Sequence, residues 1–180
     1  MVPKAGLNPT LRHDSVRLPL TEFKIKEAGM IDILRTRRSI RRYKTKPIDA
    51  ESLKILKEAL LRSPSSRGLN PWTFIFVDKP DLLAQLSQAK EHGSGFLKGA
   101  ALGIVVCGDE TVSDVWVEDT SIASVVAHLT AHSLGLGSCW VQIRKREHSK
   151  EQTAEQYVQA VLGIPPHIRV EAIIAVGFPA

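Results

Sequence analysis

The chain has 180 residues, 43% hydrophobic and 24% charged, which fits one ordinary globular domain with a substantial core. It shows neither a membrane-length apolar run nor the apolar core of a signal peptide, so we expect a cytoplasmic protein that does not enter a membrane. The net charge is +5, but seven of the twelve residues from 35 to 46 are basic and the remaining 17 basic residues face 19 acidic ones, so the positive charge is local.

Residues 1–29 contain several prolines and no clear hydrophobic period, which predicts an N-terminal extension, of open status in the native protein, before one domain at 30–180. In that domain helical and strand patterns alternate, which favours a sheet with helices on both faces. The predicted elements are, in order, helices at 30–36 and 50–62, a loop at 63–71, a strand at 72–77, a helix from 79 to about 89, a mobile glycine-rich segment at 91–99, a strand at 101–107, a central helix at 119–134, a strand at 138–143, a helix at 151–162 and a strand at 170–178.

Candidate metal ligands and nucleophiles are few. His128 and His132 lie four residues apart on the predicted central helix, but Leu129 stands where the zinc-protease motif has Glu. We therefore expect no metal site, and we interpret the two histidines as part of a polar seam at a helix or subunit contact. Cys107 and Cys139 lie far apart in apolar surroundings, which predicts two reduced, buried thiols.

The glycine-rich residues 135–137 follow a helix and open a strand, which excludes the dinucleotide-binding loop, where glycines follow a strand and open a helix. They predict a helix-ending turn, or backbone that runs close to a flat ligand. Asp114, Glu118 and Asp119 lie near the start of the central helix, where acidic side chains typically cap the helix and offset its dipole.

The basic cluster around Arg37–Tyr43 has three interpretations. It could be a solvated face, a nucleic-acid patch or a phosphate site for a small ligand. Only Tyr43 is aromatic there, and the rest of the chain is slightly acidic, which disfavours nucleic acid. Ser39 places a hydroxyl donor between arginines, which favours a small anionic ligand.

Four segments, in order, resemble the FMN-dependent nitroreductase family. Arg37–Tyr43 resembles its Arg-Arg-Ser-x-Arg-x-Tyr motif, and residues 63–74 resemble its Pro-Ser-Ser segment that ends in Pro-Trp. Residues 131–140 are similar to its Leu-Gly-Leu-Gly-Ser segment, and residues 162–179 to its C-terminal signature. Each segment is weak alone, but four in the right order and spacing form a specific pattern.

The resemblance implies an α+β sandwich with a mostly antiparallel sheet flanked by helices, in an intertwined homodimer with two FMN sites at its interface. It implies two-electron transfer from NADH or NADPH to a nitroaromatic, a quinone or a similar small-molecule acceptor. The flavin carries this chemistry, so no catalytic side chain is assigned. The acceptor and the choice between NADH and NADPH stay open. The alternatives are an FMN-binding module without robust turnover, such as a sensor, and a nucleic-acid-binding domain.

The resemblance also assigns the cofactor site. Arg37 contacts the FMN phosphate, Ser39 lies close to phosphate or ribityl oxygens, and Arg41 lies near the pyrimidine, where a cation stabilises the reduced flavin. The 64–70 loop reaches the flavin from the partner subunit, and the backbone at 141–143 lies by its N5 edge. The predicted cofactor-binding residues are Arg37, Arg38, Ser39, Arg41, Pro64, Ser65, Ser66, Asn70, Val141, Gln142 and Ile143.

Three departures from the family pattern bear on this site. Gly68 and Asn70 stand where the family often has Asn and Gln, and the chain stops at Ala180, where the family often continues into a tail with a basic phosphate contact. Arg38 or Arg42 would then compensate for that contact. The chain also lacks the usual helical insertion over the flavin, which predicts an open site.

Overall fold

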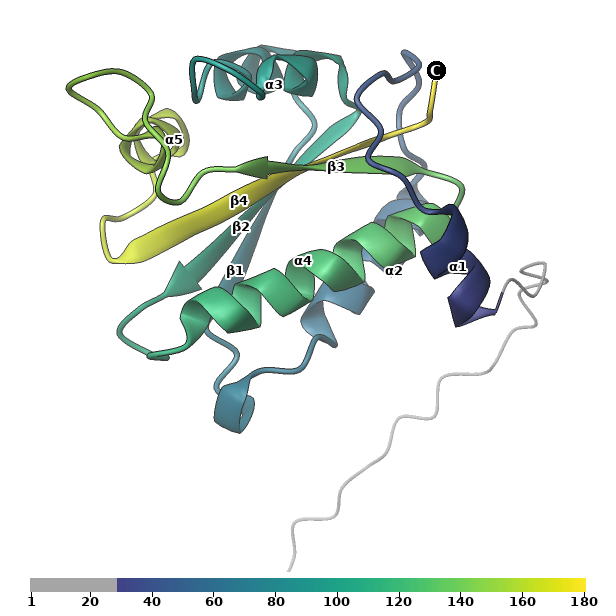
Figure 1. The fold of residues 1–180 in the computed structure, drawn as a ribbon, viewed down its shortest axis with the longest axis horizontal. Helices are drawn as coiled ribbons and strands as arrows, with labels where there is room; N and C mark the ends of the chain where they lie inside the picture. Colours follow the sequence, from purple (N-terminus) through teal and green to yellow (C-terminus); the bar gives the residue numbers. More distant parts are fainter. Residues whose placement is uncertain (1–28) are drawn as a thin grey trace, which may run out of the picture.

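The computed structural model describes residues 29–180, in which four strands form one sheet in the order β1-β2-β4-β3 with every neighbouring pair antiparallel (Figure 1). The predicted extension at 1–29 lies outside the described residues except for Gly29. The elements are α1 (Met30–Thr36), α2 (Ala50–Leu61), β1 (Trp72–Val77), α3 (Pro80–Leu86), β2 (Leu102–Asp109), α4 (Trp116–Ser133), β3 (Gly137–Gln142), α5 (Ala154–Leu162) and β4 (Ile168–Gly177), with short 3-10 turns at Ser66–Gly68 and Gly95–Gly99.

The two central strands, β2 and β4, are apolar along most of their length because both of their faces are covered. Ile104 and Val106 of β2 pack with α2 and α4, whereas Val105 and Cys107 pack with α3 and α5. Helices therefore cover both faces of the sheet, as predicted (Figure 1). Cys107 and Cys139 are free, buried thiols, also as predicted.

The prediction of a mobile segment at 91–99 is wrong for its second half. Residues Gly95–Gly99 form a 3-10 turn, and the side chain of Leu97 is completely buried against α3 and the sheet. Because Leu97 is one apolar residue in a glycine-rich segment, the sequence pattern did not indicate its burial. No helix in residues 29–180 is long and apolar enough to cross a membrane.

Candidate active site at the edge of the sheet

The open edge of β3 is the feature near which the predicted site residues of the basic segment and of the 141–143 segment lie. Within residues 29–180, β3 pairs with β4 on one side and meets only a short bridge on the other, where Ile40 N donates to Ser138 O at 3.0 Å. Backbone groups alternate in direction along a strand, so those of Gln142 point to the same open edge as those of Ser138. The backbone of Val141 faces β4. Of the predicted trio at 141–143, Gln142 alone presents its backbone to a ligand.

The absence of a side chain at Gly137 allows a close contact within the chain. A Cβ atom at this position would lie 2.7 Å from the Cβ of Ile40, closer than any side chain could tolerate. This glycine is therefore explained by the approach of the 38–40 segment, and the prediction of a flat ligand beside the 135–137 backbone stays a prediction. Gly135 has a φ of +73° and ends α4 in the left-handed conformation, as the helix-ending turn requires.

Four cations lie along β3 and have no acidic partner within residues 29–180: Arg37, Arg41, Lys90 and Arg146. Burial raises the pKa of the Cys139 thiol on β3, and the charges of Arg41, Lys90 and Arg37 oppose this rise. Lys90 in turn has its pKa lowered by burial and by Arg146. We call these four residues the cation row.

Two histidines of α4 form polar contacts close to the start of the cation row. His128 Nδ1 and Ser138 Oγ are 2.7 Å apart, and His132 Nε2 lies 2.8 Å from Thr36 Oγ1. Burial and the charge of Arg37 lower the pKa of His128 to about 4, so this imidazole is neutral near pH 7. The predicted polar seam therefore joins α4 to β3 and α1 within one chain. Among residues 29–180, no cluster of His, Cys, Asp and Glu could hold a metal ion.

The other predicted arginines and Ser39 differ in what they offer a ligand. Arg38 Nη1 donates to the backbone oxygens of Arg35 and Arg37 at 2.7 and 2.8 Å, so this guanidinium closes the end of α1 and lies outside the cation row. The guanidinium of Arg41 lies 5.7 Å from the centre of the Phe96 ring. Ser39 is exposed beside the bridge to β3.

The predicted partner-reaching loop, residues 63–71, is fixed by polar contacts. Ser65 Oγ donates to Asn70 Oδ1 at 2.8 Å and accepts from Asn70 N at 2.9 Å. Ser66 N donates to Asp119 Oδ1 at 2.7 Å, and Ser113 Oγ donates to Asp119 Oδ2 at 3.1 Å. Asp119 was expected to serve its own helix, but its buried carboxylate anchors this loop instead. Pro64, which begins the loop's predicted site residues, is exposed.

The loop and Arg37 lie near opposite ends of α4, a helix that can be followed in Figure 1. The loop is tied to Asp119, near the start of this helix, whereas Thr36 contacts His132, near its end. The 18 residues of α4 span about 27 Å at a rise of about 1.5 Å per residue. One chain therefore does not bring its own Ser65 to its own Arg37.

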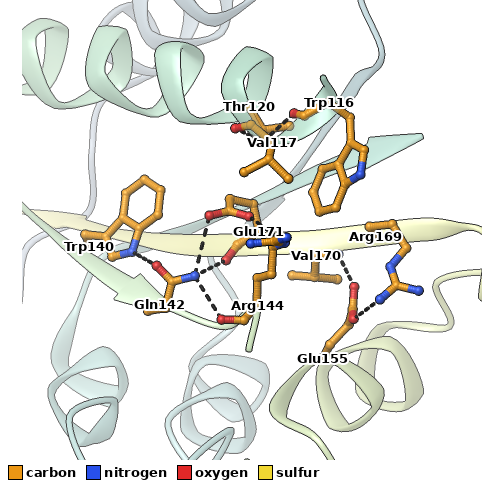
Figure 2. Close-up of polar contacts among 10 residues, drawn as sticks. All are labelled: Trp116, Val117, Thr120, Trp140, Gln142, Arg144, Glu155, Arg169, Val170 and Glu171. Atoms are coloured by element: carbon orange, nitrogen blue, oxygen red, sulfur yellow. Dashed lines mark hydrogen bonds and ion pairs between the residues drawn. The ribbon is translucent and has the colours of Figure 1, made fainter. Parts of the chain in front are cut away.

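A buried polar network fixes the end of β3 (Figure 2). The register between β2 and β4 shifts between Val106 and Cys107, and this bulge leaves Glu171 without a partner on β2. Gln142 Oε1 accepts from Trp140 Nε1 at 2.9 Å. Gln142 Nε2 donates to Arg144 O at 3.0 Å and to Glu171 Oε1 at 3.4 Å. The amide side chain is thereby engaged within the protein, which leaves only the Gln142 backbone for a ligand.

Glu171 is the member of this network whose carboxylate is buried and incompletely hydrogen-bonded. It is 5% exposed, its Oε2 atom has no hydrogen-bond partner within residues 29–180, and Arg144 Nε lies 3.9 Å away. Burial raises the pKa of Glu171 above its ordinary value, although Gln142 and Arg144 oppose the rise. The folded protein therefore holds this proton more tightly than the unfolded chain does. Stability attributable to Glu171 is present at low pH and is lost as pH rises through its folded pKa.

We expect Glu171→Gln to stabilise the protein near pH 8 by roughly 1 kcal/mol, because a neutral amide avoids the cost of a buried charge. Near pH 4, where the acid is neutral, the two proteins should be equally stable. Thermal unfolding from pH 4 to pH 8 measures this. Glu58→Gln, on the exposed surface of α2, is the matched control. A Glu171→Gln protein that loses stability relative to the wild type as pH rises would contradict the assignment.

Sequence reasoning missed Lys90, Arg146 and Glu171. The run Arg144-Lys145-Arg146, directly after a predicted strand, was the available signal for a second basic cluster. Lys90 and Glu171 gave no such signal, because their roles depend on long-range packing.

The fold and this edge define an α+β protein with a cluster of cations beside the open edge of its sheet. The family model for the Nitroreductase family matches residues 34–93 and 83–178, so the chain belongs to the nitroreductase family.

Similar proteins support the same assignment. A protein of Archaeoglobus fulgidus named as an NADH dehydrogenase/NAD(P)H nitroreductase is 38% identical over 154 residues, which cover 83% of this chain and 84% of the relative. A counterpart in Methanothermobacter thermautotrophicus is 31% identical over 174 residues, 95% of this chain and 87% of the relative. The solved FMN-dependent nitroreductase of Clostridium difficile R20291 is similar at a TM-score of 0.82 and 44% identity, over 83% of this chain and 87% of the other.

A solved protein of Desulfovibrio desulfuricans, described as a nitroreductase in complex with FMN, has a TM-score of 0.71 and 25% identity, over 86% of this chain and 88% of the other.

Proposed function

We propose that this protein is a homodimeric, FMN-dependent oxidoreductase that transfers two electrons from NADH or NADPH to a nitroaromatic, a quinone or a similar acceptor. The observation that carries this proposal is the cation row along the open edge of β3. Relatives named as NAD(P)H nitroreductases and a similar structure in complex with FMN support it.

The residues of the edge fit FMN. Arg37 is half-buried beside a neutral histidine, and Ser39 is an exposed hydroxyl next to it, so both suit a phosphate. Arg41 would place a fixed positive charge near the flavin pyrimidine. The outward backbone of Gln142 would meet the other edge of the ring, held in place by the network beneath it. Bound FMN would supply the redox chemistry, accepting hydride from the donor and passing two electrons to the acceptor.

The protein's own contribution would be to position the flavin and to stabilise the negative charge of its reduced form. Pre-organised guanidinium groups stabilise negative charge without having to move during reaction. Arg41 is steadied by the Phe96 ring, and Arg37 by its half-buried position. This explains why the sequence shows no nucleophile–base pair.

A homodimer would complete the site. The loop that carries Ser65 and Asn70 lies about one α4 length from Arg37, so a partner must bring its loop to this cation row. The middle of α4 exposes Ile122 by 43% and Val125 by 54%, an apolar face that a second copy would cover. A two-fold axis across that face would run the two α4 helices antiparallel and place each loop beside the other chain's Arg37.

The visible spectrum of the purified protein, incubated with FMN under anaerobic conditions, tests the proposal. We expect flavin absorbance that bleaches on adding NADH or NADPH and returns when a quinone or nitroaromatic acceptor is added. Retained flavin that neither donor reduces would favour an FMN-binding module. Failure to retain FMN would contradict the proposal altogether.

A further inference from the structure

A basic hollow lies where β3 ends. Its volume is about 280 Å³, and its walls come from the turn after β3, from the start of α5 and from the start of β4. The residues that line it are Arg144, Lys145, Arg146, Glu147, Thr153, Glu155 and Arg169. Four of these side chains are cationic and two are acidic, so the hollow carries an excess of positive charge.

The acidic groups near the hollow are mostly engaged by other partners. Glu155 Oε1 accepts from Val170 N at 2.8 Å, and Glu155 Oε2 accepts from Arg169 Nη2 at 2.6 Å (Figure 2). Arg144 lies near the buried Glu171. Arg169 Nε is buried without a hydrogen-bond partner within residues 29–180. The hollow therefore keeps a surplus of positive charge, and its Arg169 has one buried donor atom that no protein group within residues 29–180 satisfies.

Lys145 and Arg146 are the cations of the hollow that form no ion pair with any residue of 29–180. Glu147 is the remaining carboxylate in the lining, and its backbone bridges to Thr153 at the start of α5. One free carboxylate thus faces two free cations. An anionic ligand would balance this charge and would accept hydrogen bonds from both side chains.

The hollow lies at the end of the cation row that is farther from Arg37. Arg146 belongs to both, and its charge helps to lower the pKa of Lys90, which lies by Cys139 on β3. FMN has a single phosphate, which the proposed function assigns to Arg37 at the opposite end of β3. The positive charge beyond the end of β3 is then available to a second anionic molecule that approaches the same edge.

We propose that this hollow binds a phosphate group of the nicotinamide donor, held by Lys145 and Arg146. The inference rests on the proposed function, because it places the donor beside the edge where the flavin would lie. NADH and NADPH share a pyrophosphate, and NADPH has an additional 2′-phosphate. Both sources offer the same chemistry to the two side chains.

The backbone of Lys145 permits a clean test. Its φ of 56° lies in the left-handed region, where glycine is favoured over any residue with a Cβ atom. Lys145→Gly therefore removes the cation without straining the turn. Arg146→Gln removes the second charge and keeps a long polar side chain. The double variant should fold as the wild type does, and Lys54→Ala, exposed on α2, is a control for loss of a remote positive charge.

Steady-state kinetics of the FMN-loaded dimer give the first readout. We expect the double variant to raise the KM for the donor about ten- to hundredfold, a larger change than any in kcat, because charge-assisted contacts to the donor are lost. An increase confined to NADPH assigns the 2′-phosphate, and equal increases for both donors assign the pyrophosphate. Unchanged KM values for both donors would overturn the proposal.

Calorimetric titration with adenosine 2′,5′-bisphosphate and with ADP gives a readout that does not depend on turnover. The wild type and the Lys54→Ala control should bind one or both probes, and the double variant should bind them about tenfold or more weakly. Equal affinity in all three proteins, or no binding by the wild type, would overturn the proposal. Absence of FMN from the purified and reconstituted protein would instead count against the proposed function, and this titration would still test the hollow.

Discussion

Arg37→Ala is expected to weaken FMN binding by about ten- to hundredfold, the equivalent of roughly 1.5–3 kcal/mol for a charge-assisted contact. Arg37 is half-buried at the start of β3 and has no acidic partner within residues 29–180. Its neighbour His128 is neutral, because burial and Arg37 itself lower the imidazole pKa to about 4. The guanidinium is therefore free to bind a phosphate.

Quenching of FMN fluorescence on titration with the apoprotein measures this loss. Arg62→Ala is the matched control, because Arg62 is an exposed arginine at the end of α2 that pairs with Glu58. Arg37→Lys should retain part of the affinity, since it keeps the charge but loses the forked geometry. If Arg37→Ala binds FMN as tightly as the Arg62→Ala control does, the phosphate site is not at the start of β3.

Most of the fold was predictable because its strands and helices have strong local signals. The aromatic and β-branched run at 72–77 forms β1 with the predicted bounds, and the helix at 30–36 is also confirmed in full. The continuous apolar run after residue 101 correctly indicated a strand covered on both faces. The antiparallel order of the sheet came from the family resemblance, since no local pattern specifies it.

The site was predictable only where a motif marked it. The basic segment predicted Arg37, Arg38 and Arg41 as cofactor ligands, but the side chain of Arg38 donates to backbone oxygens at the end of α1, a contact that depends on the folded helix. The outward direction of the Gln142 backbone depends on which residue of β3 meets Ile40. Lys90 reaches the edge through tertiary packing, so it has no counterpart in a sequence pattern.

Mixing two damaged proteins should restore FMN binding that neither has alone. Ser65→Trp is expected to block the flavin slot with its large side chain, because the Ser65 hydroxyl is packed against Asn70 in the loop that would face the flavin. Arg37→Ala damages the other half of the site. The Ser65 loop and Arg37 lie at opposite ends of α4 in one chain, so each complete site should combine Arg37 of one subunit with the loop of its partner.

A mixed dimer of these two variants would then carry one doubly damaged site and one intact site. Random exchange of equal amounts of the two proteins should restore about a quarter of the wild-type sites, measured at an FMN concentration near the wild-type Kd. The unmixed variants, treated in the same way, are the controls. If one subunit supplied both halves of its own site, every site in the mixture would remain damaged and no binding would return. The recovered fraction therefore separates a site shared across the dimer from a site within one chain.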